Sequence, residues 1–251
     1  MKVFFIGAGP GDPKLITVKG QEIIAQADVI IYAGSLVNPE VLNQRKPEAI
    51  VYNSAAMTLA EVLAVMEKAV AHNQIVARVH TGDPSIYGAI KEQMDALDAK
   101  NIPYEIIPGV SSFLAAAASL KSEYTLPGIS QTVILTRLEG RTPVPEKEKL
   151  ASLAVHQASM CIFLSSAMIN EVVTELLTSY PPTTPVAVVF KASWPEELII
   201  RGTLATIEEE VKKQGINKTA LILVGYFLDS EYEFSRLYDP SFSHEYRRAS
   251  S

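Results

Sequence analysis

A glycine-rich turn near the N-terminus is the first segment whose residue types suggest chemistry. Gly7-Ala8-Gly9-Pro10-Gly11-Asp12 follows a short apolar run and precedes a helical pattern. Nucleotide-binding loops occupy this position in α/β proteins, because glycine lets backbone amides approach a ligand closely. The spacing departs from the dinucleotide fingerprint, since Asp12 stands where the third glycine belongs, and no P-loop lysine follows. A tight turn without a ligand is the alternative.

Two further loops with glycine follow predicted strands. Residues 81–88, TGDPSIYG, come after a strand predicted at 75–80, and residues 108–112, PGVSS, come after one predicted at 104–108. The carboxyl ends of parallel strands share one edge of a sheet, where open α/β sheets bind ligands. We therefore predict that the glycine loops form one site, in which Asp83 accepts hydrogen bonds from ligand amino or hydroxyl groups. Each loop alone is equally typical of a turn or a helix start.

The elements that carry these loops alternate between short β-rich runs and longer helical patterns. Strands are predicted at 3–7, 28–33, 49–53, 75–80 and 104–108, and helices at 17–27, 58–73, 86–100 and 111–120. Such alternation is typical of a mostly parallel sheet covered by helices on both faces. The sequence predicts an N-terminal α/β domain over residues 1–120.

Beyond residue 120 the strands follow one another with fewer helices between them. Strands are predicted at 132–138, 160–165, 185–192, 198–204 and 219–228, and helices near 146–157, 168–179 and 205–214. Successive strands with short connections favour antiparallel pairs. Residues 121–251 are therefore predicted to form a second α/β domain with a mixed sheet, ending in a polar and aromatic tail.

The amino-acid composition argues against several kinds of binding partner. The chain has 22 Lys and Arg against 28 Asp and Glu, a net charge of −6, which argues against a nucleic-acid partner. No apolar run approaches the roughly 18 residues of a membrane span. The one cysteine, Cys161, excludes an internal disulfide and is expected to pack as a small apolar side chain. We expect a cytoplasmic protein with no membrane association and no metal site.

Four segments together resemble a known family. GAGPGD at 7–12, DVIIYAGSLV at 28–37, TGDPSIYG at 81–88 and IPGVSS at 107–112 are similar to the tetrapyrrole methylases. Members of this family transfer methyl groups from S-adenosylmethionine to ring carbons of corrin and sirohaem precursors. The resemblance covers nearly the whole chain. It implies two α/β domains with the cofactor in an active-site cleft between them, and a homodimer.

Within the family the chain resembles one branch more than the others. The segments that carry this resemblance are residues 32–37, 54–59, 130–143, 191–196 and 218–225. They are similar to the branch that methylates carbon 11 of precorrin-4. Residues 136–145 and 231–240 resemble the anaerobic type, which implies cobalt-precorrin-4 as substrate. Ala33 and Gly34 stand where uroporphyrinogen methylases carry an aspartate, which counts against uroporphyrinogen.

The resemblance also implies site residues. The cofactor contacts that it assigns are Pro10, Gly82, Asp83, Ile86, Ser111, Ser112, Ser165, Ala192, Thr219 and Ala220. A precorrin carries acetate and propionate carboxylates, which guanidinium and ammonium groups bind well. The candidate cations in or beside these segments are Arg78, Arg137, Arg141 and Lys191. The alternative for Arg137 and Arg141 is pairing with nearby glutamates on the surface, and no residue is assigned as a proton acceptor.

Two other functions stay open. A methylase of the same fold can act on a macromolecule, as a diphthine synthase or a ribosomal RNA 2′-O-methyltransferase does. An RNA substrate predicts a basic stripe, which this acidic composition does not suggest. A non-catalytic tetrapyrrole carrier would need a place for the ring system without the cofactor loops.

Overall fold

The computed structural model describes residues 2–34, 36–229, 231–235, 239–243 and 245–249. It divides into two compact units. The first comprises the chain up to Ala116 together with Lys191–Glu197, and the second comprises Ala117–Phe190 and the residues from Leu198 onward. The sequence interpretation sets a single boundary near residue 120 and assigns residues 191–197 to the second domain. In the structure this segment packs with the first unit.

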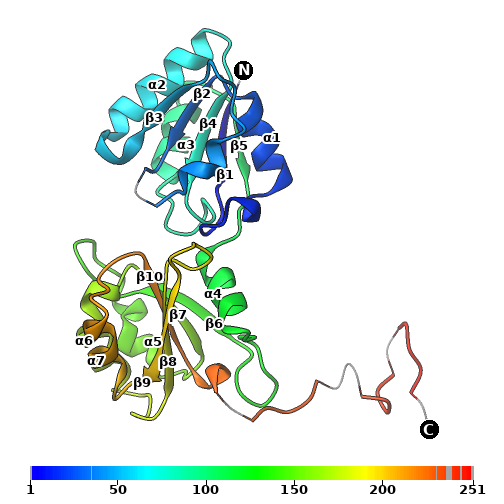
Figure 1. The fold of residues 1–251 in the computed structure, drawn as a ribbon, viewed down its shortest axis with the longest axis vertical. Helices are drawn as coiled ribbons and strands as arrows, with labels where there is room; N and C mark the ends of the chain where they lie inside the picture. The colour runs from blue at the N-terminus through cyan, green and yellow to red at the C-terminus, as the bar shows by residue number, and fades with distance from the viewer. Residues whose placement is uncertain (1, 35, 230, 236–238, 244, 250–251) are drawn as a thin grey trace. The chain divides into compact units, whose positions relative to one another are not determined.

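The first unit contains a five-stranded parallel sheet with the order β3-β2-β4-β1-β5 (Figure 1). Its strands are β1 (Val3–Gly7), β2 (Val29–Tyr32), β3 (Ile50–Asn53), β4 (Val76–His80) and β5 (Tyr104–Ile107). Its helices are α1 (Val18–Gln26), α2 (Leu59–Ala71), α3 (Lys91–Asp98) and the start of α4 (Ser112–Leu120). Short 3-10 turns lie at η1 (Pro13–Leu15), η2 (Pro39–Leu42) and η3 (Ser54–Ala56). The parallel sheet confirms the predicted architecture.

The central strands of this sheet, β1, β2 and β4, are buried on both faces, as their continuous apolar runs require. Because successive side chains point to opposite faces, Phe5 of β1 joins a core with Val62 and Met66 of α2. Its neighbour Ile6 joins a second core with Ile24 of α1. The two apolar layers hold the strands so that β1, β4 and β5 end side by side.

The second unit contains a five-stranded mixed sheet with the order β6-β7-β10-β8-β9. Only β6 and β7 run parallel; the other pairs are antiparallel, as the short connections predict. The strands are β6 (Val133–Arg137), β7 (Ser159–Phe163), β8 (Pro185–Phe190), β9 (Leu198–Thr203) and β10 (Ala220–Val224). The helices are α5 (Leu150–Ala154), α6 (Ile169–Leu176) and α7 (Ile207–Lys213), with 3-10 turns η4 (Glu146–Glu148), η5 (Ser166–Met168) and η6 (Tyr226–Leu228).

Several elements are shorter than the sequence predicts, and backbone conformation explains two of the larger differences. Helix α3 begins at Lys91 rather than near residue 86, because Tyr87 and Ala89 have positive φ angles of 55° and 49°, which interrupt a right-handed helix. The strand predicted at 219–228 ends at Val224, because Gly225 turns the chain with a φ of 139°.

No helix of the described residues has the length and apolar composition that a bilayer crossing requires.

Candidate functional site

The three glycine loops interlock at the carboxyl edge of the parallel sheet. Gly9 and Gly82 form an antiparallel bridge, in which Gly82 N donates to the Gly9 carbonyl at 2.8 Å. A Cβ added at Gly109 would lie 2.2 Å from the Gly82 carbonyl oxygen and 2.7 Å from the Gly7 Cα. Side-chain carbons do not approach backbone this closely, so only glycine permits the arrangement. The structure therefore brings together the loops that the sequence predicts as neighbours.

Asp83 ties the second loop to the third. One of its carboxylate oxygens accepts the Gly109 amide at 2.8 Å, and the other accepts the Ser85 amide at 2.8 Å and the Ser85 hydroxyl. Burial alone would raise the pKa of Asp83, but the hydrogen bonds from Ser85 and Gly109 outweigh it and hold that pKa below 3.8. Part of the acceptor capacity that the sequence assigns to a ligand is thus used to hold the loops.

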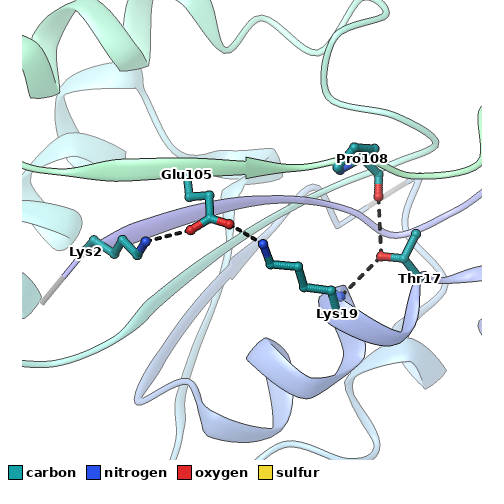
Figure 2. Close-up of polar contacts among 6 residues, drawn as sticks. Lys2, Thr17, Lys19, Glu105 and Pro108 are labelled. Carbon is teal, nitrogen blue, oxygen red and sulfur yellow. Dashed lines mark hydrogen bonds and ion pairs between the residues drawn. The ribbon is translucent and has the colours of Figure 1, made fainter.

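The N-terminal end of α1 also holds the third loop (Figure 2). Thr17, the N-cap of α1, donates from its hydroxyl to the Pro108 carbonyl at 3.4 Å. Next to it, Glu105 of β5 pairs with Lys19 of α1 and, at 2.6 Å, with Lys2. Hydrogen bonds from both ammonium groups lower the pKa of Glu105 to about 2. The strand before the loop and the loop itself are therefore fastened to the same helix.

The first loop is fixed by side chains that the sequence analysis does not select. Asn38, which follows β2, is buried and donates to the Gly11 carbonyl at 2.9 Å. Trp194, from the Lys191–Glu197 segment, donates from its indole to the Pro10 carbonyl at 2.9 Å. The sequence marks both residues in a general way. Asn38 precedes a proline, a pattern typical of an N-cap, and Trp194 is the only tryptophan of the chain. Neither signal indicates which loop the side chain contacts.

Most of the predicted cofactor residues belong to the first unit. They are Pro10, Gly82, Asp83, Ile86, Ser111, Ser112 and Ala192. Ser111 and Ala192 are buried, and a Cβ on Gly82 would lie 3.5 Å from the Ser111 Cα, so the second and third loops are in close contact here. Lys191 precedes Ala192 in the chain. Its Nζ atom lies 3.5 Å from a carboxylate oxygen of Glu196 and 5.1 Å from the centre of the Trp194 ring. The cofactor contacts themselves stay predictions.

The remaining predicted cofactor residues, Ser165, Thr219 and Ala220, lie along one edge of the mixed sheet. Arg137, one of the predicted substrate-binding cations, lies at the same edge. The parallel strands β6 and β7 end at the same edge of the sheet, where Arg137 is paired with Phe163. Strand β10 runs antiparallel to β7, so it begins at the edge where β7 ends. Ser165 is fully buried, and its hydroxyl donates to the Phe163 carbonyl at 2.7 Å and accepts the Leu138 amide at 2.9 Å. The Ser165 hydroxyl is therefore used within the protein, and its contact with the cofactor stays a prediction.

The arginines after β6 differ in their surroundings. Arg137 donates to the backbone carbonyls of Leu138, Thr142 and Pro143 at 3.3, 3.0 and 2.9 Å, and so holds the loop 138–143 in shape. Arg141 is exposed on that loop. Of the two, Arg141 has the guanidinium that is available to a ligand carboxylate.

Arg78 is buried within the first unit. Its guanidinium donates to Gln93 of α3 at 3.1 Å, to the Ile31 carbonyl of β2 at 3.3 Å and to the Ser54 hydroxyl at 3.1 Å. Burial lowers the pKa of Arg78 to about 10. His80, on the same face of β4, has its pKa lowered to about 3 by burial and then by the charge of Arg78. Arg78 thus braces the end of β2, and its contact with a substrate stays a prediction.

Among the described residues, no group of three or more His, Cys, Asp or Glu side chains is arranged to hold a metal ion. Cys161 is buried in β7, where burial raises the pKa of its thiol to about 12. The thiol is therefore protonated at neutral pH and is not a nucleophile in the ground state.

Gly109→Ala should disrupt the interlocked loops. The new methyl group would overlap the Gly82 carbonyl, so the free energy of unfolding should fall by about 1–3 kcal/mol, the usual cost of overpacking. Urea unfolding measures this change. Gly140→Ala is the matched control, because a Cβ there meets only the Met168 methyl, at 3.6 Å. Equal unfolding free energies for the two variants would show that the loops do not touch as described.

The Asp83 hydrogen bonds should make stability depend on pH. Because the folded pKa lies below the unfolded value of 3.8, the carboxylate stabilises the fold above that value. The stabilisation is lost as the pH falls through the folded pKa. The difference in unfolding free energy between the parent and Asp83→Asn should stay constant above about pH 5 and shrink below about pH 4. A difference that does not change with pH in urea titrations would contradict the carboxylate's role.

Comparison with known proteins agrees with this geometry. The model of the Tetrapyrrole (Corrin/Porphyrin) Methylases matches residues 2–208. A relative from Methanocaldococcus jannaschii, named cobalt-precorrin-4 C(11)-methyltransferase, is 61% identical over 99% of this chain and 96% of its own.

Solved structures give the same result. A cobalt precorrin-4 methyltransferase, described as a cobalamin biosynthetic enzyme, has a TM-score of 0.89 at 48% identity, covering 91% of this chain and 96% of its own. A uroporphyrin-III C-methyltransferase from Thermus thermophilus, in complex with S-adenosylhomocysteine, has a TM-score of 0.76 at 25% identity, covering 91% and 94%. With its parallel sheet, its mixed sheet and its glycine loops, the chain belongs to the tetrapyrrole (corrin/porphyrin) methylases.

Proposed function

We propose that this protein is an S-adenosylmethionine-dependent methyltransferase of cobalamin biosynthesis that methylates carbon 11 of cobalt-precorrin-4 to give cobalt-precorrin-5. The observation that carries the proposal is the high identity, over almost the whole chain, to a relative with that name. The structurally similar cobalt precorrin-4 methyltransferase supports the same substrate. Carbon 11 is the position given in the name of that relative.

The interlocked loops fit the cofactor. Gly82 is buried, and because it has a φ of +58° and no side chain, the backbone of the second loop packs closely beside Ser111. The other first-unit residues that would hold the cofactor are Pro10, Asp83, Ile86, Ser112 and Ala192. Ser165, Thr219 and Ala220 of the second unit stay predicted cofactor contacts. The structurally similar uroporphyrin-III enzyme was solved with S-adenosylhomocysteine, the product that this cofactor leaves.

When bound, S-adenosylmethionine supplies a methyl group activated by a positively charged sulfur. The task left to this chain is to orient the ring carbon towards that methyl group and to exclude water. The pinned loops suit this task, because a fixed backbone positions the reacting groups without reorganising.

Substrate carboxylates require local cations on an acidic protein. We assign direct contact to Arg141, which is exposed, and a supporting role to Arg137, whose guanidinium holds the loop that carries Arg141. Lys191 is the second candidate contact, placed by its neighbours Glu196 and Trp194. Gly34 packs against Asn53, and an added Cβ would lie 2.0 Å from the amide oxygen, so a larger residue at that position would require the Asn53 side chain to shift.

A homodimer and a cytoplasmic site of action stay predictions. Phe227, in the apolar segment 225–228 that could bury either in the core or against a partner, is buried against Tyr124 of its own unit, with ring centres 4.8 Å apart. Two of the segments that carry the branch resemblance fall partly outside the described residues, at Ser35 and at residues 236–238.

The product of the purified enzyme tests the proposed activity. Incubation with cobalt-precorrin-4 and isotopically labelled S-adenosylmethionine should add one labelled methyl group, located at carbon 11 by carbon NMR. Metal-free precorrin-4 is the matched comparison and should react more slowly. Binding of the tetrapyrrole without methylation would support a carrier, and methylation of elongation factor or ribosomal RNA alone would support the other branches of the fold.

Arg141→Gln should weaken substrate binding selectively. A charge-assisted hydrogen bond to a carboxylate contributes about 1.5–3 kcal/mol, so the KM for the tetrapyrrole should rise roughly tenfold or more. The KM for S-adenosylmethionine should hardly change. Lys147→Gln, which removes a charge from an exposed position nearby, is the control and should leave both constants unchanged. An unaltered tetrapyrrole KM in Arg141→Gln would remove this arginine from the substrate site.

A further inference from the structure

The turn that begins the Lys191–Glu197 segment is held in a fixed shape. Lys191 and Ser193 have positive φ angles of 48° and 67°, which non-glycine residues adopt only when their surroundings enforce it. Trp194 N donates to the Lys191 carbonyl at 2.9 Å, and the Glu197 carboxylate accepts the Ser193 amide at 2.6 Å. The turn therefore presents Ala192, a predicted cofactor contact, in one conformation.

This turn is joined to the first glycine loop by two hydrogen bonds. The Trp194 indole donates to the Pro10 carbonyl at 2.9 Å, and the Ser193 hydroxyl accepts the Asp12 amide at 3.0 Å. Gly11 lies between these bonds. A Cβ added to Gly11 would lie 2.0 Å from the Cδ1 atom of the indole, so any side chain at position 11 would require the ring to shift.

We propose that Trp194 is a positioning residue that holds the first loop and the 191–194 turn as a single piece of the cofactor site. The inference rests on the proposed function, because it concerns how Pro10 and Ala192 keep a fixed separation. These two residues are 182 positions apart in the sequence, and the indole is the largest group that joins their segments. The same ring lies 5.1 Å from the Lys191 ammonium and so also orients a candidate substrate cation.

A role limited to filling space does not account for these contacts. Trp194 is half-buried rather than part of the apolar cores, and its one polar atom bonds to the loop. An indole N–H is a donor only, so the Pro10 carbonyl uses the single polar function that tryptophan offers. A role limited to filling space would leave the hydrogen bond from the indole to the Pro10 carbonyl without an explanation.

Trp194→Phe is the first test, because it keeps an aromatic ring and removes the N–H donor. Its Kd for S-adenosylhomocysteine, measured by calorimetry, should rise about two- to tenfold, the value of one hydrogen bond. The KM for S-adenosylmethionine should rise in parallel, with the tetrapyrrole KM less affected. Tyr180→Phe is the matched control, since it removes a 2.6 Å side-chain bond to the Ala158 carbonyl in the second unit and should bind the nucleoside like the parent.

A double-mutant cycle tests whether Gly11 and Trp194 act together on the Kd for S-adenosylhomocysteine. Gly11→Ala places a methyl group against the indole and should weaken S-adenosylhomocysteine binding in the parent. In a Trp194→Ala background the methyl group has room, so the same change should have little further effect. Additive effects on the Kd would overturn the inference.

Amide hydrogen exchange without any ligand separates this inference from the proposed function. The Asp12 amide should exchange faster in Trp194→Phe than in the parent, and at the parent rate in Tyr180→Phe. If the parent binds S-adenosylhomocysteine and Trp194→Phe binds it equally well with unchanged exchange, the positioning role is wrong and the function stands. If the parent does not bind it at all, the proposed function fails, and the positioning role fails with it.

Discussion

The close approach of three backbones at Gly7, Gly82 and Gly109 is the constraint on which the rest of the site depends. A Cβ at Gly7 or Gly109 would lie 2.2–2.7 Å from neighbouring backbone atoms, so the loops can meet only while these positions lack side chains. Once they meet, the Gly9 and Gly82 amides and carbonyls satisfy one another, and Asp83 can reach the Gly109 amide. Backbone contact thus creates the geometry, and side chains then fasten it.

Sheet topology makes this approach possible. The order β3-β2-β4-β1-β5 places β4, β1 and β5 side by side, although long stretches of sequence separate them. Their carboxyl ends therefore deliver three loops to one edge, where an open α/β sheet has room for a ligand. Fastening then comes from outside the loops: Thr17 bonds to Pro108, and Trp194 bonds to Pro10. A site built in this way needs little rearrangement when the reactants arrive.

The sequence predicts what local pattern determines. Apolar runs and helical periodicity locate every strand and α-helix, and the glycine loops are recognised because they follow strands. Contacts between distant segments are not visible in this way. Nothing in the pattern near Trp194 indicates Pro10 as its partner, and nothing near Arg78 reveals that its guanidinium is buried against Gln93. Family resemblance selects Ala192 but not the turn that holds it.

The most direct test of the central claim is amide hydrogen exchange of the full chain with and without S-adenosylhomocysteine. If the interlocked loops form the cofactor seat, added ligand should slow exchange at residues 7–12, 81–86 and 108–112 together. The groove between α1 and η2, lined by Lys14, Gln21 and Asn43 among others, should exchange as before. Unchanged exchange at the three loops in the presence of bound ligand, or protection confined to that groove, would contradict the account.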